Sequence, residues 1–182
     1  MRTSFAPSFV LLATVLLAAP ARAAPPQSYF TFGATRGGFD ATAPAGCTLT
    51  SANDAATGGS LGVGYAFGEH LALEFGFINL GTLDATAACP GPTSVVITAP
   101  DSGLQLSGVL RLPFGDAGDT RGAALFGRLG GFSWSENAQS GVEPIIGLGL
   151  EWRFDFNTSL RVEYDDFGDG LDAIQLTLRW DY

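Results

Sequence analysis

The last ten residues, 173–182, limit the possible folds of this chain more than any other stretch. From Ile174 to Tyr182, a large apolar side chain occupies every second position, and polar side chains fill the positions between. A period of two is typical of a β-strand with one apolar and one polar face. In a soluble sheet the apolar face covers a core, whereas in a transmembrane barrel it faces lipid. The apolar face consists of Ile174, Leu176, Leu178, Trp180 and Tyr182.

Seven earlier segments also have strand character, so the sequence predicts an all-β chain. The expected strands cover residues 28–39, 60–67, 71–81, 103–112, 123–134, 143–154, 160–165 and 173–182. Spanning strands need about nine to eleven residues, and bacterial outer-membrane barrels contain an even number of them. We therefore expect an eight-stranded antiparallel up-and-down transmembrane β-barrel.

The connections between these strands alternate in length. Residues 40–59 and 82–102 are long and polar, and we interpret both as loops, while only residues 68–70 separate the second and third strands. Within the second loop, residues 94–98 are rich in β-branched side chains, and we expect them to extend a hairpin beyond the bilayer. Long loops on one side and short turns on the other are typical of external loops and periplasmic turns. The other connections are expected at 115–122, 136–142, 155–159 and 166–172.

Two cysteines fall in the two long loops, on the same side of the expected barrel. In an exported chain we expect Cys47 and Cys89 to form a disulfide, with two free thiols as the alternative. Closing a loop of about 43 residues would stabilise the fold by roughly 4 kcal/mol in the chain-entropy model.

The start of the chain has the pattern of a secretory signal. Arg2 supplies the positive start, residues 9–19 the apolar segment, and Ala21-Arg22-Ala23 a small-x-small cleavage site. We expect residues 1–23 to be removed and residues 24–182 to form the barrel domain; an uncleaved anchor is the alternative. No later apolar run reaches the roughly 18 residues of a transmembrane helix, so we expect any membrane crossing to be made by strands.

The basic residues of the chain are all arginine. Two of the nine leave with the signal, so seven arginines stand against 18 acidic residues in the mature chain, a net charge of −11. Such an acidic chain excludes a nucleic-acid-binding role, because that role needs a basic footprint.

The distribution of charge over the two strand faces favours a membrane barrel over a soluble one. Eight charged side chains share the polar phase of the expected strands: Glu74, Arg111, Arg128, Glu151, Arg153, Arg161, Glu163 and Arg179. The opposite face is almost wholly aliphatic and aromatic, and it would overfill the interior of a small soluble barrel. Glycines and charges do fit inside, where eight strands leave room only for side chains. We therefore expect a packed polar lumen without an open pore; a soluble periplasmic barrel of lipocalin type is the alternative.

Several tracts of the chain resemble the membrane domain of the OmpA-type outer-membrane proteins. They are Gly64-Tyr65-Ala66-Phe67, Leu73-Glu74-Phe75-Gly76-Phe77, Leu80-Gly81, Gly127-Arg128-Leu129-Gly130-Gly131 with Trp134, Gly149-Leu150-Glu151-Trp152, Leu160-Arg161-Val162-Glu163-Tyr164 and the alternating terminus. In order and spacing they cover essentially the whole mature chain. The shorter OmpX-type relatives are an equally good comparison.

The resemblance implies a location in the outer membrane of a Gram-negative bacterium and a charged network in the lumen. The positions that match this network are Glu74, Arg128, Glu151, Arg161 and Glu163. Where the family tends to carry a lysine on the fourth strand, this chain has Val109, with Arg111 two residues on and on the same face. The terminal strand is similar to the family's signal for the outer-membrane assembly machinery. Because the chain stops at Tyr182, we do not expect the peptidoglycan-binding domain that many relatives carry.

Three classes of function follow from these observations. Buried charges need partners, so we expect a structural network, with a low-conductance channel for small solutes or ions as the alternative. The expected pairs join Glu74, Glu151 and Glu163 to Arg111, Arg128, Arg161 and Arg153. Disulfide-tied loops of about twenty residues favour adhesion or ligand binding in addition.

A lipid-modifying enzyme is the third class, and it needs a base beside a nucleophile. The one histidine, His70, lies in an expected turn with no serine near it in sequence. We therefore expect no catalytic residue, cofactor or metal site. We expect a monomer surrounded by outer-membrane lipids and lipopolysaccharide, with no surface ligand identified by the loop composition.

Overall fold

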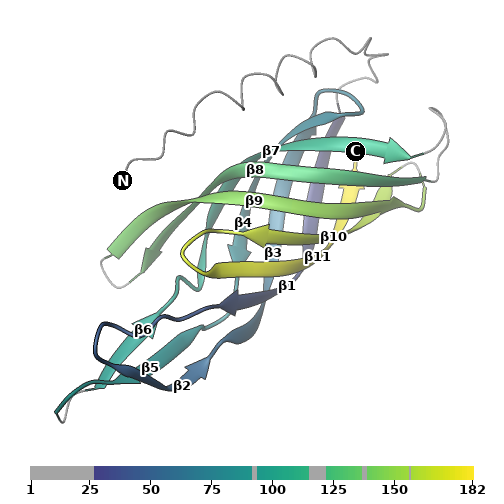
Figure 1. Ribbon diagram of the computed structural model, residues 1–182. Coiled ribbons are helices and arrows are strands. Elements are labelled where there is room, and N and C mark those ends of the chain that lie inside the picture. Colours follow the sequence, from purple (N-terminus) through teal and green to yellow (C-terminus); the bar gives the residue numbers. More distant parts are fainter. Residues whose placement is uncertain (1–26, 92–93, 115–121, 137–138, 156) are drawn as a thin grey trace, which may run out of the picture.

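The structure is a computed structural model that describes residues 27–182, except 92–93, 115–121, 137–138 and 156 (Figure 1). The expected signal segment, residues 1–23, and nearly all of the expected turn 115–122 lie outside the described residues. The strands of the described part are β1 (Gln27–Phe39), β2 (Thr48–Asn53), β3 (Ala55–Ala66), β4 (Leu71–Asn79), β5 (Asp84–Ala88), β6 (Ser94–Thr98), β7 (Ser102–Phe114), β8 (Gly122–Glu136), β9 (Gln139–Arg153), β10 (Thr158–Asp166) and β11 (Leu171–Asp181). Over these same residues, no helix is long and apolar enough to cross a membrane.

Eight of the strands close into a barrel in the order β1-β11-β10-β9-β8-β7-β4-β3, with antiparallel neighbours throughout. The first strand closes the barrel by pairing with the last, from Tyr29 opposite Asp181 to Phe39 opposite Leu171. The predicted eight-stranded barrel is therefore confirmed. The strand limits differ most at the starts of β3 and β9: β3 begins at Ala55 and not at residue 60, and β9 begins at Gln139 and not at residue 143.

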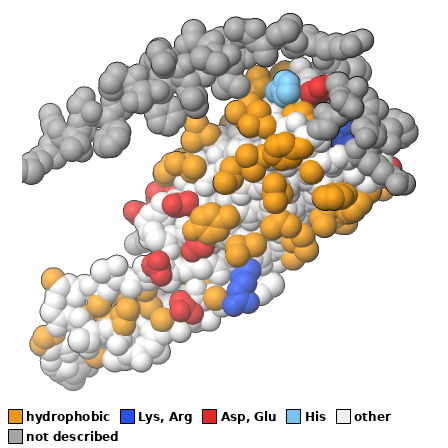
Figure 2. All heavy atoms as spheres, turned by 45° about the vertical axis from the view of Figure 1, so that its right-hand side comes forward, with side chains coloured by type: hydrophobic (Ala, Val, Ile, Leu, Met, Phe, Trp, Pro, Cys, Tyr) orange, Lys and Arg blue, Asp and Glu red, His pale blue; other side chains and the backbone are white. Residues whose placement is uncertain are grey.

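The barrel wall turns its apolar side chains outward and its charged ones inward. Leu61 is 62% exposed and Leu148 60%, whereas Glu151 and Arg161 are each 1% exposed. On the face that Figure 2 shows, the outward side chains form a broad hydrophobic belt. Leaving apolar area in water costs about 25 cal/mol per Å², so a belt of this kind needs an apolar surrounding. The faces are those expected for a barrel in lipid.

Glycines provide room inside the barrel for large side chains. Gly64 lies opposite Tyr29 across β1 and β3, and a Cβ at Gly64 would fall on the Tyr29 ring. Gly149 has the same relation to Phe126, whose ring would lie 2.5 Å from a Cβ at that position. The alternation of glycine with polar residues on the inward face is thus a packing requirement.

The other three strands form a separate sheet in the order β2-β5-β6. It stands beyond the barrel at the end away from the C-terminus (Figure 1). We call it the distal sheet, and we call that end of the barrel the distal end. Residues 94–98 form β6, as expected for a hairpin beyond the barrel. The interpretation of 40–59 and 82–102 wholly as loops is wrong, because these stretches contain β2, β5, β6 and the start of β3. β2 and β5 consist mostly of Thr, Ser, Ala and Asn, so they lack the apolar alternation that reveals a strand.

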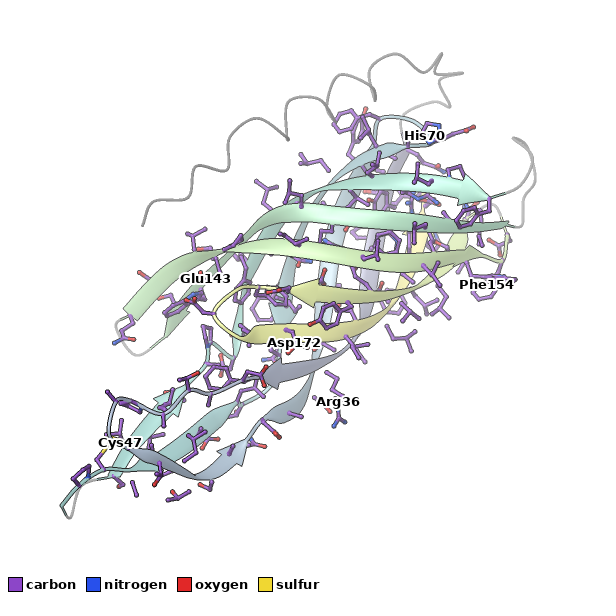
Figure 3. The ribbon with its side chains drawn as sticks, in the orientation of Figure 1. Arg36, Cys47, His70, Glu143, Phe154 and Asp172 are labelled. Atoms are coloured by element: carbon purple, nitrogen blue, oxygen red, sulfur yellow. A yellow bond between two sulfur atoms is a disulfide. The ribbon has the colours of Figure 1, made fainter. Side chains whose placement is uncertain are left out.

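A disulfide ties the far tip of the distal sheet. Cys47 precedes β2 and Cys89 follows β5, and their sulfur atoms are 2.01 Å apart. Figure 3 shows Cys47 at the tip, away from the barrel. The predicted disulfide is therefore present in the structure. It joins the two stretches that the sequence places on one side of the barrel.

Candidate functional site

The lumen holds an ion-pair network with Glu151 at its centre. β9 turns this side chain inward, where its Oε1 accepts a hydrogen bond from Arg111 Nη2 at 2.5 Å. Its Oε2 lies 2.8 Å from Arg161 Nε and 3.7 Å from Arg179 Nη1. Three buried guanidinium groups therefore share one carboxylate.

Glu74 on β4 forms a second centre of the network. Its Oε2 lies 2.8 Å from Arg128 Nη2, and its Oε1 lies 2.5 Å from Arg161 Nη1. The Tyr29 hydroxyl donates a further hydrogen bond to Oε1 at 2.5 Å. Because Arg161 contacts both carboxylates, it joins the two centres into one network.

Arg128 extends the network toward the distal end. Its Nε and Nη2 donate to the two oxygens of Glu163 at 2.5 Å and 2.9 Å, and its Nη1 donates to Ser107 Oγ at 2.8 Å. Two parallel hydrogen bonds to one carboxylate fix its orientation as well as its charge. Asp165 lies 3.7 Å from Arg128 Nε and accepts a hydrogen bond from Gln175 Nε2.

Arg179 and Asp181 form the other end of the network, near the chain terminus. Arg179 Nη2 lies 2.6 Å from Asp181 Oδ1. Arg153 Nη2 lies 3.8 Å from Asp181 Oδ2, and the Arg153 side chain is 31% exposed. Arg153 therefore lies at the edge of the network.

All eight charged residues that the sequence places in the lumen take part in these contacts, and the charges balance. Five arginines meet five carboxylates once Asp165 and Asp181 are included. These two aspartates were not predicted to belong to the network, although both lie on the inward phase of their strands. Tyr29 and Gln175 were not predicted either, because they are uncharged and the prediction used only the charged residues on the polar faces of the strands.

Aromatic rings pack against the arginines on the side nearer the terminus. Arg179 Cζ lies 3.7 Å from the centroid of the Tyr29 ring, and Arg161 Cζ lies 5.0 Å from that of Phe126. A guanidinium over an aromatic face gains roughly 0.5–2 kcal/mol when it is shielded from water. Tyr29 and Phe126 belong to a small buried apolar cluster with Ala66, Ala72 and Val109.

An apolar plug fills the distal end of the lumen. It consists of Ile78, Leu80, Leu83, Ala99, Phe132, Ile145, Phe167, Leu171 and Ala173. The rings of Phe132 and Phe167 meet edge to face with centroids 5.1 Å apart. The expectation of a wholly polar lumen is therefore wrong at this end. Phe167 and Leu83 come from connections between the expected strands, so strand periodicity gave no sign of them.

The segments that connect the distal sheet to the barrel are hydrogen-bonded to the barrel rim and to one another. Phe39 N donates to Asp54 O at 3.0 Å, and Leu80 N donates to Asp101 O at 2.6 Å. Ala99 N donates to Leu83 O at 3.0 Å, which continues the β5–β6 ladder into the plug. The sheet is therefore a continuation of the barrel fold and not a tethered appendage.

The one histidine lies at the opposite end from the distal sheet (Figure 3). His70 is exposed, its ring Nδ1 lies 3.1 Å from Arg111 O, and its own carbonyl accepts a hydrogen bond from Arg111 N at 2.7 Å. These contacts fix the turn between β3 and β4 against β7. Among the described residues, no group of three His, Cys, Asp or Glu side chains is placed to hold a metal ion.

The terminal strand presents its alternating apolar residues to the outside. Ile174, Leu176, Trp180 and Tyr182 are exposed, and the Tyr182 ring stacks on Phe30 with centroids 5.0 Å apart. The aromatic pair lies at the end of the barrel away from the distal sheet. Aromatic side chains at such a level are typical of a membrane interface.

Comparison with known proteins gives a family match and several structural likenesses. The family model for the outer membrane protein beta-barrel domain matches residues 9–178. The outer membrane protein OprG from Pseudomonas aeruginosa is 13% identical, with a TM-score of 0.55 over 89% of this chain and 98% of its own. A de novo designed transmembrane β-barrel is 14% identical, with a TM-score of 0.50 over 88% of this chain and 99% of its own. At these identities the likeness shows the fold alone. No curated protein matches the sequence.

Proposed function

Because the chain belongs to the outer-membrane β-barrel family and lies in the outer membrane of a Gram-negative bacterium, we propose that it is a sealed membrane anchor that displays the distal sheet outside the cell. The observation that carries this proposal is the combination of a filled lumen with a disulfide-tied sheet beyond the barrel. On this proposal the barrel anchors the distal sheet in the membrane, and the sheet provides the surface that other molecules contact.

The lengths of the connections support an outward-facing sheet. Outer-membrane barrels have short periplasmic turns and longer extracellular connections. Here β3 and β4 are joined by 67–70 and β9 and β10 by 154–157, both at the end near the terminus. The long connections that contain β2, β5 and β6 lie at the distal end. The distal end is therefore the extracellular end on this proposal.

The packing of the lumen supports a structural role over a channel. The salt bridges and the distal plug together occupy the width of an eight-stranded barrel, which has room only for side chains. An ion would have to separate buried pairs on its way, and breaking one such pair costs about 3–5 kcal/mol. We therefore expect no conductance in planar bilayers from the wild-type protein or from a Glu151→Gln variant.

The surroundings of His70 favour a role in the turn over catalysis. Its ring contacts a backbone carbonyl, and a general base needs a proton donor from substrate or nucleophile within about 2.6–3.2 Å. We propose that the protein has no lipid-modifying activity. Activity on lipopolysaccharide that is lost on His70→Ala would contradict this.

We further propose that the apolar belt contacts outer-membrane lipids, including lipopolysaccharide, and that the protein is a monomer. The terminal strand, from Ile174 to Tyr182, is the segment we propose as the signal for the assembly machinery. Its support is the outward row of apolar side chains that ends in an aromatic residue. We also propose that residues 1–23 are a signal peptide and that residues 24–182 form the mature barrel domain.

The absence of lysine from the sequence makes the display proposal directly testable. Ala88→Lys places an amine at the exposed end of β5, near the disulfide, and Glu69→Lys places one in the exposed turn at the opposite end. On intact cells, an amine-reactive dye that does not cross membranes should label Ala88→Lys and leave Glu69→Lys unlabelled. Both should be labelled after the cells are broken. Because the dye also reacts with the N-terminal α-amine, labelling is compared with the wild type. On intact cells, labelling of Glu69→Lys above the wild type, with Ala88→Lys labelled no more than the wild type, would reverse the orientation and overturn the proposal.

Removal of the sheet then tests whether the display has a function. Leu83 and Ala99 are a hydrogen-bonded pair, so a two-residue Asn-Gly turn can replace residues 84–98. With Cys47→Ser to remove the free thiol, the barrel should keep its heat-modifiable migration on gels. Attachment of cells to surfaces, or sensitivity to phage, should fall. If every surface phenotype is unchanged, the sheet is not the functional part.

A further inference from the structure

The distal sheet has two outer edges, β2 and β6. In the order β2-β5-β6, no strand of the described chain pairs with the outer side of either. An edge strand presents N–H and C=O groups that can pair with a strand of another chain. The two edges differ in how well they could do so.

The β2 edge is irregular. Its register with β5 shifts between Leu49 and Ser51, and the hydroxyl of Thr50 donates to Thr86 O at 3.1 Å. A bulge of this kind twists an edge and interrupts the row of groups that a partner strand would need. β6, in contrast, pairs with β5 at five successive residues without a shift, and its sequence contains neither charge nor proline. The β6 edge is therefore the better suited of the two to pair with a strand of another chain.

The register identifies the backbone groups that face outward from β6. Ala99 N donates to Leu83 O, so this pair belongs to the hydrogen-bonded type. Pairs alternate along an antiparallel ladder, so Ile97 and Val95 bond to β5. The N–H and C=O groups of the alternate residues then point away from the sheet. These residues are Ser94, Val96 and Thr98, and all three are exposed.

Charge distinguishes between the possible partners of this edge. No lysine or arginine occurs between residues 37 and 110, while four aspartates lie where the sheet joins the barrel: Asp40, Asp54, Asp84 and Asp101. Figure 2 shows several acidic side chains and one basic side chain around this junction, and Figure 3 places the exposed Arg36 of β1 there, so the acidic groups are in excess. Asp84 lies directly opposite Thr98, at the barrel end of β6. A second copy of this chain would bring the same negative charges together, whereas a cationic segment would be attracted.

From these observations we propose that β6 is a docking strand, to which an extended cationic segment of a partner protein is added as a fourth strand of the sheet. The backbone of the segment pairs with Ser94, Val96 and Thr98, and a long lysine or arginine side chain of the segment extends across Thr98 toward Asp84, whose strand lies about 9.5 Å away. The disulfide holds the sheet in shape before binding, which reduces the ordering that binding requires. This inference rests on the proposed display of the sheet outside the cell.

The test uses the full chain in detergent and a labelled synthetic peptide of alternating threonine and valine with lysines at both ends. Val96→Pro removes an outward N–H without removing a hydrogen bond to β5, and Val96→Thr keeps it. We expect saturable binding to the wild type and to Val96→Thr. Binding to Val96→Pro should be at least about tenfold weaker, and so should binding of a peptide with glutamates in place of the lysines. Unchanged heat-modifiable migration and an intact disulfide show that each variant is folded.

Three binding results would overturn the inference. They are equal binding to wild type and Val96→Pro, equal binding of the lysine and glutamate peptides, and no saturable binding to the wild type. A dimer in sedimentation that Val96→Pro dissociates would make a second copy the partner, and this too would overturn it. Because binding is measured in detergent, failure here is separate from failure of the display proposal, which the labelling of Ala88→Lys on cells decides.

Discussion

Replacement of Glu151 by glutamine is the substitution whose effect on the free energy of unfolding can be estimated most directly from the structure. Glutamine keeps the size of the side chain and removes the negative charge that Arg111, Arg161 and Arg179 share. Arg161 retains Glu74, and Arg179 retains Asp181. Arg111 has no other ion-pair partner among the described residues, so its buried charge is left uncompensated.

The size of the effect follows from the burial of the pair. Removing one partner of a buried salt bridge costs about 3–5 kcal/mol, because the remaining charge stays desolvated. With a urea dependence of about 2 kcal/mol per molar, this loss should lower the unfolding midpoint by about 1.5–2.5 M. Adding Arg111→Met removes the orphaned guanidinium. The double variant should therefore recover about 1–3 kcal/mol of the loss.

The assay is urea unfolding of the protein in lipid vesicles, followed by tryptophan fluorescence and by migration on gels without boiling. Glu143→Gln is the matched control, because Glu143 also lies on β9, is only half-buried and takes part in no ion pair of the described residues. Its midpoint should shift by less than about 0.5 M. If Glu151→Gln shifts the midpoint no more than the control does, the lumen network does not hold the barrel together.

The other predictions concern packing, the disulfide and a turn. Gly64→Ala should destabilise the barrel by about 1–3 kcal/mol, because its Cβ meets the Tyr29 ring, whereas Gly127→Ala has room and should be close to neutral in the same urea assay. Cys47→Ser should make the distal sheet sensitive to protease while the barrel keeps its heat-modifiable migration, because the tie closes only the sheet. Backbone N–H groups of Asn157 and Thr158 donate to Asp155 and lower the pKa of its carboxyl. The stabilisation of this turn is therefore present at neutral pH and lost as pH falls through the lowered pKa. An NMR titration that places the pKa at or above the ordinary value of about 3.9 would contradict this.

The barrel could be predicted from the sequence because its strands carry a strong period of two. In β11 and β9 the outward row is mostly apolar and the inward row is mostly polar, charged or glycine, so the same pattern indicates a strand, its inward face and its apolar surroundings. The distal sheet could be predicted only in part. β6 has β-branched residues, but β5 reads Asp-Ala-Thr-Ala-Ala, and such small side chains give no contrast between faces.

The sequence predicts which residues belong to the lumen network, but it does not predict which of them form ion pairs with one another. Arg161 and Glu74 are 87 residues apart, on β10 and β4, and these strands are not neighbours in the barrel. Which side chains meet across the lumen depends on the stagger of the strands, and the alternation within one strand does not encode that stagger. Phe167 and Leu83 were missed as members of the distal plug because they enter it from connections and not from the inward phase of a barrel strand.

The orientation of the two faces of the barrel wall decides both the membrane location and the content of the lumen, and spin labels in lipid vesicles test this orientation most directly. Labels at Leu148 and Leu176, which are exposed on the wall, should be relaxed by oxygen dissolved in lipid and not by a water-soluble nickel complex. A label at Thr177, which is buried in the lumen, should be shielded from both reagents. Relaxation of Leu148 and Leu176 by the nickel complex, with Thr177 relaxed by oxygen, would show that the wall is turned the other way and would contradict the account.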